Sequence, residues 1–208
     1  MVPPLNLPIE PMLAKAVDAI PEPDAIPGGF VYEPKWDGFR GIVAVDGSGP
    51  ESGGVHSAGV HSAGVQSGGV QSGVEIGSRG SKSLTRYFPE LVATFAAQFS
   101  RPCIIDGEII VRTGARGAER LDWDALSQRI HPAASRIARL SAETPASFVA
   151  FDLLAVDDED LTDRPFSERR ARLEALFAGV VPPLHLSQTS RDAALARRWL
   201  ADFEGAGL

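Results

Sequence analysis

The chain has 208 residues with 44% hydrophobic and 23% charged residues, proportions typical of a soluble globular protein that buries a sizeable core. It has no apolar run long enough for a membrane span and no secretory signal at its start, so we expect a cytoplasmic protein with no membrane contact. A single cysteine excludes an internal disulfide, no cysteine–histidine cluster indicates zinc, and the net charge of −7 gives no support to nucleic-acid binding.

The first quarter of the chain is predicted to be extended and loop-rich. Residues 1–29 contain many prolines and predict an N-terminal arm packed on the body of the protein. Apolar residues over 29–35 predict a short strand that enters a turn, and residues 41–46 predict a β-branched strand. Residues 54–73 are four five-residue repeats, GVHSA twice and GVQSG twice, which are too short to build a core. We therefore predict a flexible low-complexity loop over residues 47–73, which connects two strands of a hairpin.

The remaining elements predict a mixed architecture. Strands are predicted over residues 74–79, 103–111 and 148–156. Helices are predicted over residues 88–99, 123–130, 168–177 and 191–203. Ser167 and Ser190 are expected to cap the last two helices, and Gly205 to end the final one. Because strands and helices mix without strict βαβ alternation, we predict an α+β fold with mainly antiparallel sheets.

The sharpest local pattern is the sequence KWDGFR over residues 35–40. A lysine at the end of an apolar strand indicates either a solvated hairpin or a functional site, since a buried ammonium costs several kcal/mol unless it is compensated. Acids interrupt two other apolar strands at Asp106, Glu108 and Asp152, and Arg79 ends a third. Charges on several core strands favour a shared polar cleft, where nearby cations can keep a lysine amine nucleophilic.

KWDGFR resembles the nucleophile motif K-x-D-G-x-R of the covalent nucleotidyltransferases, which include ATP-dependent DNA ligases, RNA ligases and mRNA capping enzymes. Further segments resemble later ligase motifs in family order: SRGSK at residues 78–82, DGE at 106–108 and FDLL at 151–154. Residues 11–14, PMLA, and the stretch 79–91 also resemble bacterial ATP-dependent DNA ligases. The resemblance covers nearly the whole chain except residues 47–73.

This resemblance implies an adenylation domain of ATP-grasp-like fold over residues 30–208, incomplete at its C-terminal end, with the OB-fold domain absent. Lys35 would attack the α-phosphorus of ATP and carry AMP. Arg40 and Arg79 would bind the nucleotide and the DNA phosphate, since their planar forks suit phosphate oxygens. Glu108 would accept a hydrogen bond from the ribose.

Two further residues are expected at the adenine. Phe151 would stack on the base, and Glu33 would read its edge. Asp152 is expected to order the nearby backbone rather than to touch substrate. No residue is assigned as a metal ligand. Three tryptophans are expected only to pack: Trp36, Trp123 and Trp199.

The activity implied is nick sealing in DNA repair and recombination. ATP as AMP donor and Mg²⁺ are the implied cofactors, with nicked or broken double-stranded DNA and end-joining repair proteins as partners. Since the C-terminal motifs of the family are missing, the chain alone is expected to ligate poorly and to be unstable or self-associating. RNA ligation or capping, and a remnant that binds nucleotide or DNA ends without turnover, remain open alternatives.

Overall fold

The structure, a computed structural model, describes residues 3–13, 15, 17–49, 73–80, 82–115 and 117–203, with the backbone alone at 202 and 203. The strands are β1 (Phe39–Val45), β2 (Val74–Ser78), β3 (Cys103–Thr113), β4 (Arg120–Leu121), β5 (Ala146–Val156), β6 (Glu159–Asp160) and β7 (Leu184–Leu186). The helices are the 3-10 turn η1 (Thr85–Tyr87), α1 (Pro89–Gln98), α2 (Trp123–Ser127), α3 (Ala134–Glu143), α4 (Phe166–Leu176) and α5 (Ala193–Phe203).

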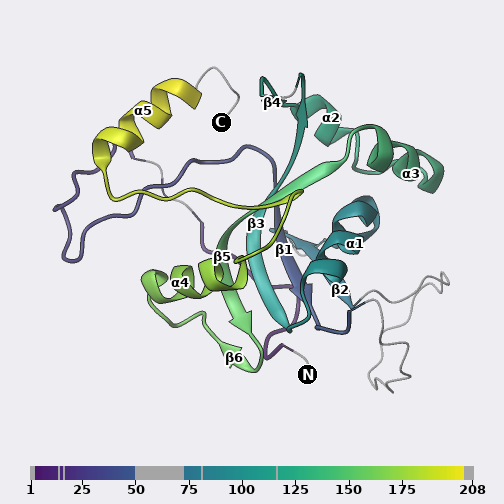
Figure 1. Cartoon of the computed structure of the whole chain (residues 1–208), viewed down its shortest axis with the longest axis horizontal. Helices are drawn as coiled ribbons and strands as arrows, with labels where there is room; N and C mark the ends of the chain where they lie inside the picture. The colour runs from purple at the N-terminus through teal and green to yellow at the C-terminus, as the bar shows by residue number, and fades with distance from the viewer. Residues whose placement is uncertain are drawn as a thin grey trace.

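The strands form one sheet in the order β2-β1-β3-β5-β6, with β4 paired to β3 and β7 to β5 (Figure 1). Every pairing between these strands is antiparallel except the parallel pairing of β5 with β7. The predicted α+β architecture with mainly antiparallel pairing is therefore confirmed. Among the described residues, no helix combines the length and the apolar character that a membrane span requires.

The predicted strand over residues 29–35 is wrong. Only Tyr32 pairs there, in an isolated bridge with Ser190, and the residues on to the start of β1 have no regular structure. Pro34 has no N–H to donate, which weakens any ladder through this segment. The irregular backbone matters for the site, because it carries Lys35.

Both predicted serine caps are also wrong. Helix α4 begins at Phe166 after Pro165, without a side-chain cap, so Ser167 lies inside the first turn. At α5 the carboxylate of Asp192 accepts the Ala194 N–H at 2.8 Å, which is the hydrogen bond of an N-cap residue. The predicted helix end at Gly205 and the repeats over 54–73, apart from Gly73, lie outside the described residues.

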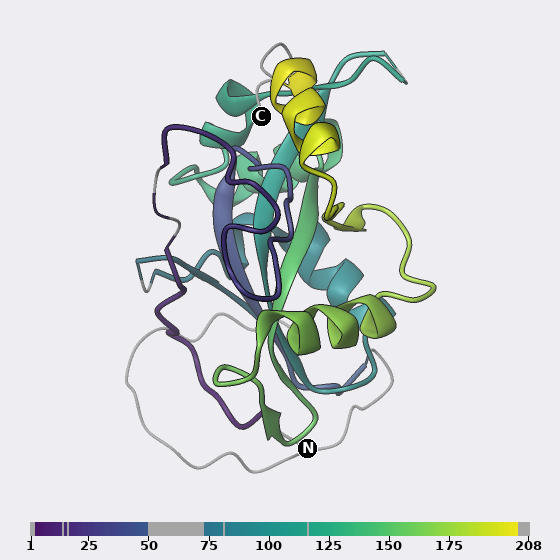
Figure 2. The ribbon, with the colours of Figure 1, turned by 90° about the vertical axis from the view of Figure 1, so that its left-hand side faces the viewer.

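One face of the sheet carries the main hydrophobic core. Helix α1 packs on it, and the rings of Phe95 and Phe148 meet edge to face with centroids 5.2 Å apart. Figure 2 views this arrangement from the side, with α4 near one end of the strands and α5 near the other.

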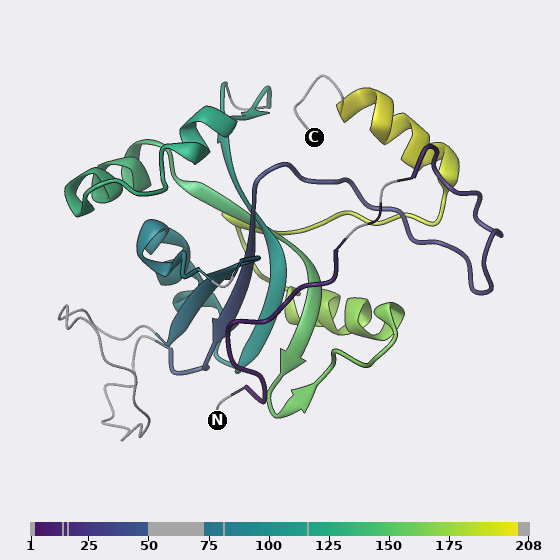
Figure 3. The same cartoon turned by 180° about the vertical axis from the view of Figure 1, so that it is seen from behind.

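The opposite face changes character along the strands. At one end Ile42 and Ile104 are buried beneath Leu5 and Leu7 of the N-terminal segment, which crosses the strands in Figure 3. Because side chains alternate between the faces of a sheet, Arg40 lies on the same face as Ile42, and Asp106 and Glu108 on the same face as Ile104. The N-terminal residues thus cover the apolar end and leave the charged end open.

A β-bulge brings Phe151 to this charged end. Asp106 pairs with Asp152 while Gly107 pairs with Ala150, so Phe151 is an extra residue in β5. Bulges turn side chains away from the regular alternation and are frequent beside active sites. Phe151 and Asp152, although consecutive, consequently both border the same cleft.

Gly107 separates the two acids of β3 and has no room for a side chain. An added Cβ would lie 2.4 Å from the Phe148 ring and 2.5 Å from the Val149 carbonyl oxygen. We expect Gly107→Ala to lower the free energy of unfolding by about 1–3 kcal/mol or more, as overpacking does. Urea unfolding followed by circular dichroism measures this, with Gly49→Ala as control, since its Cβ would meet nothing within 4 Å. Equal midpoints for both variants would contradict the expectation.

Candidate active site

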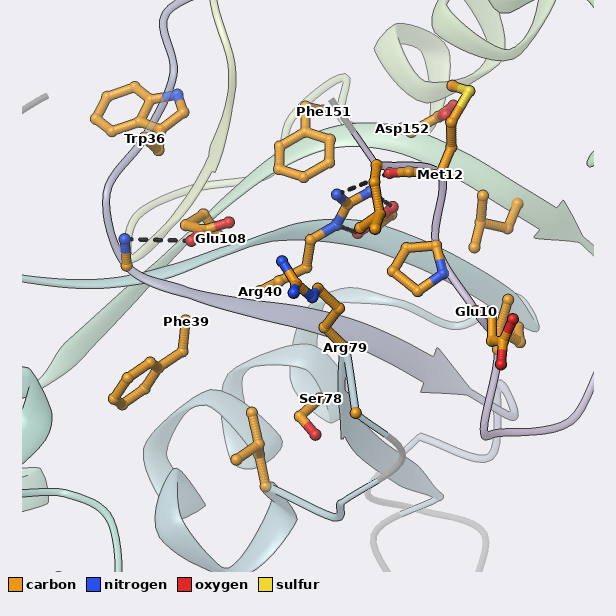
Figure 4. Close-up of a pocket in the computed structure, with 18 of the residues that line it drawn as sticks. Glu10, Met12, Trp36, Phe39, Arg40, Ser78, Arg79, Glu108, Phe151 and Asp152 are labelled. Carbon is orange, nitrogen blue, oxygen red and sulfur yellow. Dashed lines mark hydrogen bonds and ion pairs between the residues drawn. The ribbon is translucent and has the colours of Figure 1, made fainter. Parts of the chain in front are cut away.

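The charged end of the sheet forms a cleft of about 1410 Å³, larger than the roughly 300–1,000 Å³ of a typical small-molecule pocket. Its walls come from the N-terminal segment, the irregular segment before β1, the end of β2, and strands β3 and β5 (Figure 4). All six residues singled out from the sequence line it: Glu33, Lys35, Arg40, Arg79, Glu108 and Phe151. The fold thus brings together residues that are far apart in the chain.

An ion pair between Arg40 of β1 and Asp106 of β3 lies at the centre of the cleft. The Arg40 Nε donates to Asp106 Oδ1 at 2.9 Å, and a second guanidinium nitrogen donates to Oδ2 at 2.5 Å. The Asp106 side chain is only 3% exposed. Burial raises the pKa of the Asp106 carboxyl, while the hydrogen bonds from Arg40 oppose that shift.

Arg40 also makes two further contacts. Its remaining nitrogen donates to the Met12 carbonyl at 3.0 Å, and its guanidinium lies 5.1 Å from the centroid of the Phe151 ring. Arg40 therefore links the N-terminal segment, β1, β3 and β5. Figure 4 shows Arg79 extending from the end of β2 toward Arg40, so two guanidinium groups face the same space. This space favours an anion.

Lys35 lies exposed on the wall of the cleft. Within the described part of the chain it forms no ion pair or hydrogen bond, so its amine is available to a ligand. The backbone after it approaches β3 so closely that a Cβ at Gly38 would lie 2.2 Å from the Ile109 carbonyl oxygen. Glycine at this position of the motif lets the Gly38 N–H donate to Glu108 Oε1 at 3.2 Å.

Two carboxyls of the cleft titrate near neutrality. Burial raises the pKa of Glu108 to about 7, against the opposing effects of Arg40, the Gly38 N–H and Lys35. Glu33 is exposed at the rim, yet the surrounding protein still desolvates its carboxyl and raises its pKa to about 7. Perturbed carboxyls in a cleft are characteristic of functional sites.

Sequence reasoning missed several residues of this site. The Met12 carbonyl, which holds Arg40, has no signal in the side-chain pattern. Tyr87 and His131 also line the cleft, with the Tyr87 hydroxyl 3.3 Å from His131 Nδ1, and His131 has a positive φ of 69°. Trp36, expected only to pack, donates its Nε1–H to Ser187 Oγ at 3.2 Å.

Asp152 orders the backbone as expected, since its Oδ1 accepts the Leu153 N–H at 2.9 Å. It also pairs with Arg169 through two hydrogen bonds of 2.8 Å, which no sequence pattern indicated. Among the described residues, no group of three His, Cys, Asp or Glu side chains is arranged to hold a metal ion.

The chain is similar to known proteins over nearly its whole length. DNA ligase C of Mycobacterium tuberculosis is 47% identical over 209 residues, which cover 99% of this chain and 49% of that protein. DNA ligase C2 of Mycolicibacterium smegmatis is 45% identical over 205 residues, which cover 99% of this chain and 48% of that protein. The chain therefore spans about half the length of these relatives.

Among solved structures, mycobacterial DNA ligase D complexed with ATP and MES shares the fold. The match has a TM-score of 0.52 and 22% identity, and covers 84% of this chain and 44% of that chain. The predicted nucleotidyltransferase fold is thereby confirmed. Residues 65–208 match the family described as "ATP dependent DNA ligase domain". The chain is a member of this ATP-dependent DNA ligase family.

Proposed function

We propose that this chain is the adenylation part of an ATP-dependent DNA ligase, in which Lys35 takes AMP from ATP. The observation that carries the proposal is the meeting of an exposed lysine with two arginines, an aromatic ring and a carboxyl in one cleft. The relatives named as DNA ligases support it, as does the ATP bound to the ligase D structure of the same fold.

Each side chain has a role in this proposal that matches its place in the cleft. Phe151 offers one ring face to adenine, while Arg40 occupies the other, and base–aromatic stacking contributes about 1–3 kcal/mol. Glu33 at the rim would accept a hydrogen bond from the amino group of adenine, and Glu108 one from a ribose hydroxyl. Arg79 would meet phosphate oxygens, beside Arg40.

The chemistry proposed is one displacement at phosphorus. The neutral Lys35 amine forms a bond to the α-phosphorus, the bond from that phosphorus to the pyrophosphate oxygen breaks, and the amine loses a proton to water. The product is a lysyl–AMP phosphoramidate. Such transfers depend on in-line positioning and on charge neutralisation more than on acid–base catalysis. AMP would then pass to the 5′-phosphate at a DNA nick, and a 3′-hydroxyl would displace it.

Mg²⁺ belongs to the same proposal as the ion of the triphosphate. The described residues gather no three-ligand cluster, so the phosphates would supply most of its ligands, as is common for magnesium. Nicked or broken double-stranded DNA is the proposed substrate, with end-joining repair proteins as partners in the cytoplasm. We also propose that residues 1–29 act as an arm and residues 30–208 as the adenylation domain.

Substitution of Lys35 tests the proposal directly. After incubation with ATP and Mg²⁺, intact-mass spectrometry should show one added AMP, and peptide mapping should place it on Lys35 rather than on Lys15 or Lys82. Lys35→Arg should abolish the label because a guanidinium is not nucleophilic, whereas Lys15→Arg in the exposed N-terminal segment should keep it. An unlabelled parent chain would refute the proposal, and labelling by GTP in place of ATP would favour the capping type.

The titration of Glu108 predicts a pH-dependent effect on stability. Its pKa rises from 4.5 to about 7 on folding, so the folded chain holds this proton more tightly than the unfolded chain. Glu108 therefore destabilises the fold increasingly as pH rises from about 4.5 through about 7. We expect Glu108→Gln to exceed the parent in stability by on the order of 1–3 kcal/mol near pH 8.5 and to lose most of this advantage near pH 5.

Thermal unfolding at the two pH values measures this difference. Glu75→Gln is the matched control, since Glu75 is exposed on β2 and lies outside the cleft. A Glu108→Gln advantage that is the same at both pH values would show that its carboxyl does not titrate in this range.

A further inference from the structure

Outside the cleft, Arg170 of α4 is a buried cation with an incomplete set of partners. The residue is 8% exposed. Its Nε donates to Glu174 Oε1 at 2.7 Å, and Nη2 donates to the Ser187 carbonyl at 2.8 Å. The remaining nitrogen, Nη1, is buried without a hydrogen-bond partner in the part of the chain that the structure describes. Burying a guanidinium with an unsatisfied nitrogen costs free energy, which the hydrogen bonds that it does form must offset.

Ser187 connects Arg170 to the segment that carries the nucleophile. It is 1% exposed, and each of its polar groups is used. Its N–H donates to the Ala150 carbonyl of β5 at 2.8 Å, its carbonyl accepts from Arg170, and its Oγ accepts the Trp36 Nε1–H at 3.2 Å. Two hydrogen bonds through one residue therefore join Arg170 to the neighbour of Lys35.

The nucleophile segment, residues 33–38, has few other anchors. It has no regular secondary structure, and the hydrogen bonds that flank Lys35 are those of Tyr32, Trp36 and Gly38. Tyr32 exchanges two backbone hydrogen bonds with Ser190, of 2.7 and 2.9 Å. In the described part of the chain, the Tyr32 backbone and the Trp36 side chain thus attach to residues 187–190, the Tyr32 hydroxyl to the Pro21 carbonyl, and the Gly38 N–H to β3.

Packing between α4 and residues 187–190, here called the strip, leaves a hollow. A small pocket of about 290 Å³ lies there, lined among others by Val31, Arg170 and Ser190. The Arg170 side chain therefore borders a hollow between α4 and residues 189–191 while it bonds to Ser187. The Arg170 charge also acts on Glu33, where it is the largest effect that opposes the raised pKa. Arg170 consequently influences the segment on both sides of Lys35.

We propose that Arg170 is a positioning residue for Lys35, holding residues 33–38 at the cleft wall through Ser187 and Trp36. The part of this inference that concerns AMP transfer rests on the function proposed above; the part that concerns the backbone does not. Arg170 lies outside the cleft, so it holds the segment through the two hydrogen bonds, and its charge acts in addition on Glu33.

Hydrogen exchange tests the structural part without any reaction. In Arg170→Met, the hydrogen-bonded amides of Tyr32 and Gly38, which flank Lys35, should exchange about tenfold faster than in the parent chain, as local opening becomes easier. Arg172→Met is the control, because Arg172 lies on the same helix and pairs with Glu159 and Glu168, away from this strip. Unchanged exchange at both the Tyr32 and Gly38 amides in Arg170→Met would overturn the proposal.

Kinetics of AMP addition test the functional part. In Arg170→Met the rate at saturating ATP should fall about tenfold or more, because small displacements of a nucleophile are costly, while the half-saturating ATP concentration stays within about twofold. Arg170→Lys should recover part of the rate, since its ammonium can still donate to the Ser187 carbonyl. A merely destabilised fold would not produce this split between the two constants.

If Arg170→Met does not fold, Trp36→Phe tests the same proposal at the other hydrogen bond to Ser187. It removes the N–H and keeps an aromatic ring, and it should reproduce the slower labelling and the faster exchange. The double variant should be no slower than either single variant, because both break one chain of contacts. Additive losses would overturn the proposal. A parent chain that takes no AMP would refute the proposed function instead, and the exchange comparison would still decide this inference.

Discussion

The ion pair between Arg40 and Asp106 allows charged groups to lie on a sheet face whose other end is apolar. On that face, the residue next to Arg40 along β1 is Ile42, and Asp106 on β3 lies between Ile104 and Glu108. The planar guanidinium occupies both carboxylate oxygens, and its other contacts are the Met12 carbonyl and the Phe151 ring. One side chain therefore joins four segments, and loss of Arg40 would leave the buried Asp106 carboxyl without its partner, at a cost of about 3–5 kcal/mol.

The distribution of charge explains how an acidic chain can offer a surface to phosphates. The formal net charge is −7, but the cleft contains both signs in separate places. Asp106 and Glu108 are the more buried groups, whereas Lys35, Arg79 and Lys82 are exposed on its walls. Buried carboxyls orient the basic and polar groups around them, and the exposed cations line the space that an anionic ligand would enter. This arrangement supports the proposed binding of a nucleotide more directly than the bulk charge does.

Much of the sheet and the cleft could be predicted because the relevant signals are local. Runs of β-branched and apolar residues predicted β1 and β3, and acids within an apolar strand indicated that Asp106 and Glu108 face a polar space. The bulge at Phe151 could not be predicted, since it depends on the register between two strands. The Trp36–Ser187 contact joins positions 151 residues apart, and no pattern within either segment signals it.

Local signals also misled where tertiary contacts decided the outcome. The apolar residues before Pro34 suggested a strand, but they lie where only Tyr32 finds a pairing partner. Ser190 was expected to cap α5, yet its backbone forms hydrogen bonds with Tyr32. Its Oγ accepts the N–H of Asp192, at 2.9 Å, which lies before the helix begins. In each case a residue with a suitable local pattern is engaged by a distant segment instead.

Strand β1 separates the cleft, at its beginning, from the long connection to β2, at its end. Arg40, near the beginning of β1, borders the cleft. Val45, at the end of β1, pairs with Val74, the first residue of β2. At about 3.4 Å per residue, roughly 17 Å of strand lie between these points. Repeats can therefore be gained or lost in that connection without displacing the cleft residues at the opposite end of the strand. Insertions at this position would lie far from Lys35.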